Sequence, residues 1–200
     1  MDILLIFAKN PVPGQVKTRL ARTVGDEKAV EIYRFLLQKT RQVALETPMD
    51  RRWLFYASGI PEEDDIWPSS AFEKFAQCPG DLGERMADAF ERAFAAGGKH
   101  VIIIGSDCPE LTVEILGEAF AALDICDTII GPARDGGYYM LGMRRFIPEL
   151  FQGIAWSTPT VLEQTFAVFE QLRLNYSVFP TLSDIDTEAD WLAYRVRSHS

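Results

Sequence analysis

Short apolar runs alternate along the chain with longer segments in which apolar residues recur every three to four positions. The apolar runs at residues 3–8 and 101–104 are typical of strands that are buried on both faces of a parallel sheet. The same pattern predicts further strands at residues 53–57, 127–131, 138–142 and 176–179. Residues 72–77 fit either a short strand or a helix.

Helical periodicity marks the segments between these strands. It predicts helices at about residues 26–45, 82–93, 112–123, 162–169 and from 187 onward. Asp26 and Thr112 stand where a side chain can cap a helix start. The alternation of strands and helices predicts an α/β fold with a mostly parallel central sheet and helices on both faces. A chain of 200 residues has the size of one domain, so we expect a single domain over residues 1–200.

Composition and charge narrow the function classes. Hydrophobic residues make up 48% of the chain, which is enough for a packed core. The formal net charge of −9 argues against non-specific nucleic-acid binding, which needs a basic surface. No apolar run has the length of a membrane span, no signal peptide is recognisable, and three scattered cysteines fit no disulfide framework. We therefore expect a cytoplasmic protein, with the acidic run at residues 62–65 facing solvent.

A charged loop follows the first predicted strand. It contains Gly14, Lys17, Thr18 and Arg19. A turn of this kind can hold phosphate oxygens through backbone N–H groups and through the lysine and arginine side chains. The loop does not match a Walker A motif, because it lacks the required glycines. The alternative is a turn with surface charges, but ligands of open α/β sheets bind outside the carboxyl ends of the strands.

Carboxylates follow two later strands. Asp107 comes after residues 101–104, and Asp184 and Asp186 come after residues 176–179. A carboxylate at the end of a buried strand is costly unless it is compensated, and Mg²⁺ accepts one or two carboxylates together with substrate phosphates. The alternatives are a turn hydrogen bond for Asp107 and a helix cap at Asp186 or Thr187.

Glycine-rich segments stand at two more strand ends. Gly80 and Gly83 follow residues 72–77, and Gly136 and Gly137 precede residues 138–142. Glycine permits a close approach between backbone and ligand, although a helix start and a β-turn also explain these residues. Cations, carboxylates and glycine loops at the ends of successive strands together predict a pocket for a metal-bound diphosphate.

Six segments in order resemble the bacterial DUF2064 glycosyltransferase-like family: FAKNPVPGQVKTRL, QCPGDLGERMADAF, IIIGSDCPEL, GPARDGGYYMLGM, WSTPTVL and DIDTEADW. The resemblance covers about residues 3–191. It implies the GT-A fold, which is Rossmann-like, of nucleotide-diphospho-sugar transferases. The sequence GSD at Asp107 lacks the fuller DxD of many glycosyltransferases and is closer to the single aspartate of nucleotidyltransferases, so the resemblance leaves the reaction type open.

The resemblance also implies roles for individual residues. Asp107 and Asp186 would hold Mg²⁺ or Mn²⁺, facing Lys17 and Arg19 across the phosphates. The residues expected to bind the nucleotide sugar are, in chain order, Ala8, Gly14, Lys17, Arg19, Gln77, Gly80, Gly83, Ser106, Gly136, Gly137 and Tyr138.

Three hypotheses for function follow. The first is a metal-dependent glycosyltransferase with a nucleotide-diphospho-sugar donor and an unidentified small-molecule acceptor, in which Lys17 and Arg19 stabilise the leaving group and Asp135 is a candidate base. The second is a nucleotidyltransferase that joins an NTP to a phosphorylated small molecule and releases pyrophosphate. The third is a nucleotide-binding module without catalysis. The oligomeric state stays open, with Trp67 and Trp156 as candidate exposed interface residues.

Overall fold

The computed structural model describes residues 1–198 and shows a seven-stranded sheet with the order β3-β2-β1-β4-β6-β5-β7. Strand β6 runs antiparallel to its neighbours β4 and β5, and the other pairs are parallel. The mostly parallel sheet is therefore confirmed. The strands are β1 (Asp2–Ala8), β2 (Arg51–Tyr56), β3 (Glu73–Ala76), β4 (His100–Ile104), β5 (Thr128–Pro132), β6 (Tyr138–Met143) and β7 (Tyr176–Val178).

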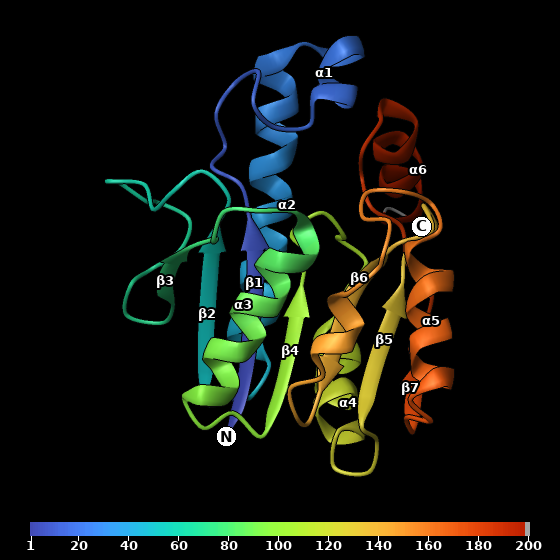
Figure 1. Ribbon diagram of the computed structural model, residues 1–200. Coiled ribbons are helices and arrows are strands. Elements are labelled where there is room, and N and C mark those ends of the chain that lie inside the picture. The colour runs from blue at the N-terminus through green and yellow to red at the C-terminus, as the bar shows by residue number, and fades with distance from the viewer. Residues whose placement is uncertain (199–200) are drawn as a thin grey trace.

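The helices lie on both faces of this sheet (Figure 1). They are α1 (Thr18–Val24), α2 (Asp26–Glu46), α3 (Leu82–Ala95), α4 (Val113–Ala122), α5 (Val161–Gln171), α6 (Glu188–Ser198) and the 3-10 helix η1 (Pro148–Phe151). Within the described residues, no helix combines the length and apolar character that crossing a bilayer requires.

Alternating side chains of the buried strands supply two separate cores. In β1, Leu4 and Ile6 pack on the side of α2 and α4, whereas Ile3 and Leu5 pack on the side of α3, η1 and α5. All four side chains are fully buried. Because both faces are covered, β1 needs an uninterrupted apolar sequence, which is the signal that predicted it.

Two helix starts show how the sequence sets local structure. Thr112 accepts a hydrogen bond from the Ile115 N–H and caps α4, as predicted. Asp81 caps α3 in a capping box with Glu84. The predicted cap at Asp26 is wrong, because Asp26 is the first residue of α2 and Gly25 holds the cap position with φ 84°. A glycine can adopt this positive φ, and Gly25 thereby separates α2 from α1.

One surface expectation holds only in part and another is wrong. Glu62, Glu63 and Asp65 of the acidic run are exposed, as expected. Asp64 belongs to the acidic run expected to face solvent, but its side chain is buried, lies 2.8 Å from the Lys74 ammonium and accepts a hydrogen bond from the Tyr56 hydroxyl. It also accepts the backbone N–H groups of Ile66 and Trp67. This network turns Asp64, Ile66 and Trp67 inward, and Trp67 is consequently buried against Phe72.

The topology directs attention to the carboxyl ends of β1 and β4. These strands are neighbours, and the chain builds the sheet outward on the β2 side before it returns to form β4. Such a reversal of strand order opens a crevice where ligands of α/β sheets bind. Helices α1 and α6 lie beyond this edge of the sheet in Figure 1.

Candidate active site

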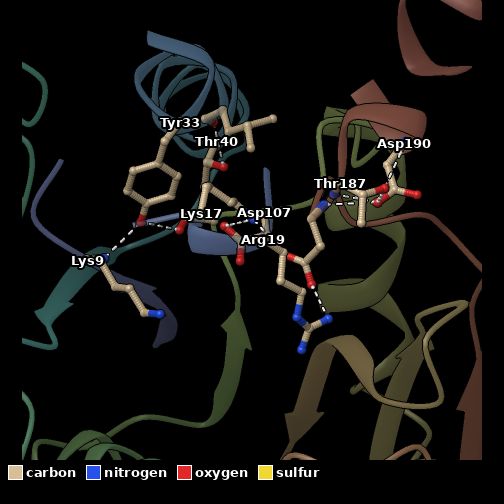
Figure 2. Close-up of polar contacts among 11 residues, drawn as sticks. Lys9, Lys17, Arg19, Tyr33, Thr40, Asp107, Thr187 and Asp190 are labelled. Atoms are coloured by element: carbon tan, nitrogen blue, oxygen red, sulfur yellow. Dashed lines mark hydrogen bonds and ion pairs between the residues drawn. The ribbon is translucent and has the colours of Figure 1, made fainter. Parts of the chain in front are cut away.

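A buried tyrosine joins the ends of β1 and β4. The hydroxyl of Tyr33, on α2, accepts the Lys9 N–H at 2.8 Å and lies 3.1 Å from Ser106 Oγ. Figure 2 shows the Tyr33 ring reaching from α2 toward Lys9. Burial and, after it, the charge of Asp107 raise the pKa of Tyr33, so its hydroxyl stays protonated at neutral pH. Tyr33 therefore fixes the spacing of the two strand ends that carry Lys9 and Asp107.

A backbone hydrogen bond brings the two predicted metal ligands together. The Ile185 N–H donates to the Asp107 carbonyl at 3.0 Å, so the segment that carries Asp184 and Asp186 runs beside the end of β4. Asp190 supports the same segment by accepting the N–H groups of Asp186 and Thr187 at 3.2 and 2.8 Å (Figure 2). These contacts place acids that are far apart in the sequence on one site.

The cation between these two acids is a side chain of the protein. Lys17 Nζ lies 3.0 Å from Asp107 Oδ1 and 3.1 Å from Asp186 Oδ1. The Lys17 side chain is only 4% exposed, whereas the two aspartates are 43% and 39% exposed. Burial alone lowers the pKa of Lys17, but the charges of Asp107 and Asp186 outweigh burial and raise it above its usual value. Without a ligand, Lys17 thus lies between the two acids and not opposite them.

The backbone at Lys17 is strained. Its φ of 49° and ψ of 43° place it in the left-handed region, immediately before α1. A non-glycine residue in this region costs about 1–3 kcal/mol and persists only where other contacts hold it. The two ion pairs are such contacts. The segment expected to be a loop as far as Arg19 is thus a strained residue followed by a short helix.

Two other cations differ from Lys17 in their partners. Arg19 is 72% exposed, and its Nη1 lies 3.5 Å from Asp186 Oδ2. The ammonium of Lys9 has no ion-pair partner among the described residues, and Lys9 lines two of the cavities at the site. Lys9 is therefore available to a bound anion, although only its position directly after β1 marked it in the sequence.

Three adjoining cavities surround these charges. The larger cavity has a volume of about 610 Å³ and includes Lys9, Gln77, Ser106 and Asp107 in its lining. The charged cavity, of about 270 Å³, is lined by Lys9, residues 16–19, Tyr33, Asp107 and Asp186. The third cavity has a volume of about 390 Å³ and lies beside Asp135, Gly137 and residues 156–159. We call it the smaller cavity, in contrast to the larger one with which it shares residues. The volumes of the larger and smaller cavities fall within the range of small-molecule sites.

Most of the predicted site residues line these cavities. The larger cavity is lined by Ala8, Gln77, Gly80, Ser106, Asp107 and Tyr138. The charged cavity is lined by Lys17, Arg19, Asp107 and Asp186. The smaller cavity is lined by Arg19, Asp135, Gly137 and Tyr138.

Three of the predicted glycines line none of these cavities: Gly14, Gly83 and Gly136. A Cβ on Gly83 would lie 2.2 Å from Trp156 Nε1, and one on Gly136 would lie 2.1 Å from the Pro159 carbonyl oxygen. These two glycines therefore permit close packing within the protein, where a close approach to a ligand was expected.

Asp184 is an acid of the site that was not among the predicted ligands. It lines both the larger and the smaller cavity. Burial, followed by the charges of Asp107 and Asp135, raises the pKa of its carboxyl to about 7. Its spacing from Asp186 was the one signal in the sequence that pointed to it.

The pKa of Asp184 predicts how stability depends on pH. An aspartate in the unfolded chain has a pKa near 3.9, so the unfolded state loses this proton at a lower pH than the folded state does. The free energy of unfolding therefore falls as pH rises from about 4 to about 7. Asp184→Asn removes the ionisation. We expect the unliganded variant to match the parent near pH 4 and to be more stable by roughly 2–4 kcal/mol at about pH 8. Urea unfolding at both pH values measures this, and a variant less stable than its parent at the higher pH contradicts it.

The carboxylates fit a divalent cation that is shared with substrate. Among the described residues, no group of three or more His, Cys, Asp and Glu side chains forms a closed metal site. Mg²⁺, however, usually keeps several waters and binds through one or two carboxylates plus substrate phosphates. Asp107 and Asp186 match this need, because both are partly exposed and already converge on one positive charge.

Comparisons with known proteins agree with this architecture. The sequence model of DUF2064, described as "Uncharacterized protein conserved in bacteria", matches residues 39–158. A candidate nucleotide-diphospho-sugar transferase from Desulfovibrio desulfuricans is 35% identical, with a TM-score of 0.89 over 100% of this chain and 88% of that chain. Among curated proteins, none is significantly similar in sequence.

Two more distant structures share the fold. CMP:2-keto-3-deoxy-manno-octonic acid synthetase, in complex with CTP, is 11% identical with a TM-score of 0.62 over 99% of this chain and 98% of that chain. Rv0371C from Mycobacterium tuberculosis, in complex with manganese, is 13% identical with a TM-score of 0.55 over 100% and 98%. The chain thus has the fold of nucleotide-diphospho-sugar transferases and nucleotidyltransferases, and it belongs to the DUF2064 family.

Proposed function

We propose that the protein is a divalent-metal-dependent transferase that moves a glycosyl group from a nucleotide-diphospho-sugar to a small acceptor. The observation that carries this proposal is the meeting of two cavities beside one charged centre. The larger cavity suits the donor and the smaller one the acceptor, and they share Leu82, Tyr138, Trp156, Ser157 and Asp184. The family relative named as a candidate nucleotide-diphospho-sugar transferase supports the same reaction class.

The charged cavity would receive the diphosphate of the donor. Lys9 is available to a phosphate, and Arg19, which is mostly exposed, offers a planar donor group toward the leaving nucleoside diphosphate. Asp107 and Asp186 would hold Mg²⁺ or Mn²⁺, which supplies charge neutralisation to the phosphates. Lys17 would lose its position between the two acids when a cation binds them, and its ammonium would then be free for a phosphate oxygen.

Loss of Lys9 tests the phosphate-binding part of this proposal. A hydrogen bond to a charged group is worth about 1.5–3 kcal/mol, so Lys9→Ala is expected to weaken binding of UDP, GDP or CDP at least tenfold. Isothermal titration calorimetry with Mn²⁺ present measures the change. Lys39→Ala is the matched control, because the Lys39 ammonium lies over the Phe35 ring of α2 and lines none of the three cavities. Equal affinities of Lys9→Ala and the parent protein would remove Lys9 from the proposed site.

Product analysis tests the reaction itself. The protein is incubated with Mn²⁺ and either nucleotide-diphospho-sugars plus an extract of small metabolites, or NTPs plus phosphorylated metabolites. Release of a nucleoside diphosphate from the first mixture is the expected result. Release of pyrophosphate from the second mixture alone overturns glycosyl transfer in favour of nucleotidyl transfer, and no product from either mixture favours a binding module.

A further inference from the structure

The turn at residues 156–159 forms one wall of the smaller cavity and is strained at its centre. Ser157 has φ 62°, and the only other non-glycine residues with positive φ among the described residues are Lys17 and Arg173. Ser157 and Lys17 both line cavities of the site, whereas Arg173 follows α5 and lines none of the three. Backbone strain of this kind clusters at ligand sites, where surrounding contacts over-determine it.

Several hydrogen bonds hold this turn. The Thr158 hydroxyl donates to the Ala155 carbonyl at 2.7 Å, and the Ala155 N–H donates to Gln164 Oε1 at 2.7 Å. The Leu162 N–H donates to the Gly136 carbonyl at 2.9 Å, which ties the turn to the loop before β6. The position of Ser157 is therefore fixed before any ligand binds.

Trp156 is held by helix α3. Its indole packs on Gly83 so closely that a Cβ there would lie 2.2 Å from Nε1. Trp156 lines both the larger and the smaller cavity. Within residues 1–198, neither the indole N–H of Trp156 nor the hydroxyl of Ser157 has a hydrogen-bond partner in the protein. The turn thus presents an aromatic ring and an unused serine hydroxyl where the cavities meet.

The charges of the smaller cavity favour an uncharged ligand. Asp135 and Asp184 line it together with Arg19, the side chain that we assign above to the leaving nucleoside diphosphate. Asp135 Oδ1 accepts the Gly137 N–H, which leaves its other oxygen without a protein partner in the described part of the chain. A phosphate ester would meet these carboxylates with no free cation to offset them, whereas hydroxyl groups can donate to them.

We propose that the smaller cavity binds the acceptor, and that the acceptor is a neutral, hydroxyl-rich compound such as a sugar or polyol rather than a phosphate ester. Trp156 and Ser157 select it, the first by packing against its C–H face and the second by a hydrogen bond. This proposal rests on the glycosyl transfer proposed above. An acceptor oxygen forms the bond to the anomeric carbon, the bond from that carbon to the diphosphate breaks, and the nucleoside diphosphate leaves with the electron pair. The hydroxyl proton passes to Asp135 and then to solvent.

Ligand-observed NMR titrations test this assignment. The probes are a panel of neutral sugars and polyols, each paired with its own phosphate ester, added to the protein with UDP and the diamagnetic ion Mg²⁺. At least one neutral compound is expected to bind at least tenfold more tightly than its ester. Tighter binding of the esters, or no binding by any neutral compound, overturns the proposal.

Matched variants test whether the neutral compound binds beside Ser157 and Asp135 in the smaller cavity. Ser157→Gly removes the hydroxyl and relieves the positive φ, so it is expected to fold normally and to weaken binding of the neutral compound at least fivefold. Arg173→Gly relieves a similar φ outside the cavities and is expected to leave binding unchanged. Asp135→Asn keeps the acceptor for the Gly137 N–H and is expected to narrow the gap between each neutral compound and its ester. Unchanged binding in Ser157→Gly contradicts the assigned role.

A separate titration of nucleotides with the metal present, but without the sugars, polyols and esters, distinguishes failure of the proposed glycosyl transfer from failure of the neutral acceptor. Failure of every nucleotide to bind refutes the proposed transfer, whatever the neutral panel does. Normal nucleotide binding together with preference for the esters refutes only the neutral acceptor.

Discussion

Asp107→Asn is expected to abolish the stabilisation that a nucleoside diphosphate and Mn²⁺ together give the protein. A ligand that binds only the folded state adds about 2.7 kcal/mol at a hundredfold excess over its dissociation constant. Asparagine keeps the backbone carbonyl that accepts the Ile185 N–H and a side-chain oxygen that can accept from Lys17, so the fold should persist. It lacks the negative charge that a divalent cation requires. Thermal and urea unfolding, with and without nucleotide and metal, measure the loss.

Asp65→Asn is the control for this variant. Asp65 is a mostly exposed acid that pairs with Arg34 away from the three cavities. We expect it to retain the full response to nucleotide and metal. An Asp107→Asn protein with the same response as Asp65→Asn would remove Asp107 from the metal site.

Lys17→Met is expected to destabilise the metal-free protein by about 2–3 kcal/mol. Removing one partner of a fully buried ion pair costs about 3–5 kcal/mol, and the partial exposure of Asp107 and Asp186 reduces this cost. Methionine retains the length of the side chain and is equally strained at the positive φ, so the change isolates the ammonium. Mn²⁺ should restore more stability to this variant than to the parent, because two acids are left without their cation.

Urea unfolding in EDTA and in Mn²⁺ measures both effects of Lys17→Met. Lys28→Met is the control, since Lys28 forms an exposed pair with Glu31 on α2 and should change stability by less than about 0.5 kcal/mol. A Lys17→Met protein that is as stable as the parent in EDTA would show that the ammonium does not compensate the two acids. A variant that is destabilised but gains nothing extra from Mn²⁺ would show that its position is not a divalent-cation site.

The sequence predicted the sheet and most helices because burial on both faces leaves a simple pattern. Each strand of the centre is an apolar run, and α4 begins at the threonine expected to cap it. The antiparallel β6 also has a local cause, since the connection from β5 is too short for the crossover that a parallel neighbour needs. Helix α1 was missed because its seven residues carry little periodicity and it depends on packing Leu20 into the core.

The candidate site was predictable only in part. Asp107 and Asp186 both follow the carboxyl ends of strands, but β6 and β5 separate β4 from β7, so the acids meet only because the segment after β7 crosses back to the end of β4. The position of Lys17 between them depends on a left-handed backbone that no local signal in the sequence demands. Tyr33 reads as a core residue of a helix, and Trp156 reads as a surface aromatic until its packing on Gly83 is known. The roles of Lys17, Tyr33 and Trp156 depend on contacts between distant segments, and the sequence alone did not predict them.

The most direct test is a crystal of the protein grown with a nucleoside diphosphate and Mn²⁺, with the metal located by its anomalous scattering. We predict a manganese peak in contact with the carboxylates of Asp107 and Asp186, a diphosphate beside Lys9, and the Lys17 ammonium moved away from the two acids. A bound nucleotide with Lys17 still bridging Asp107 and Asp186, and manganese elsewhere or absent, would contradict the account.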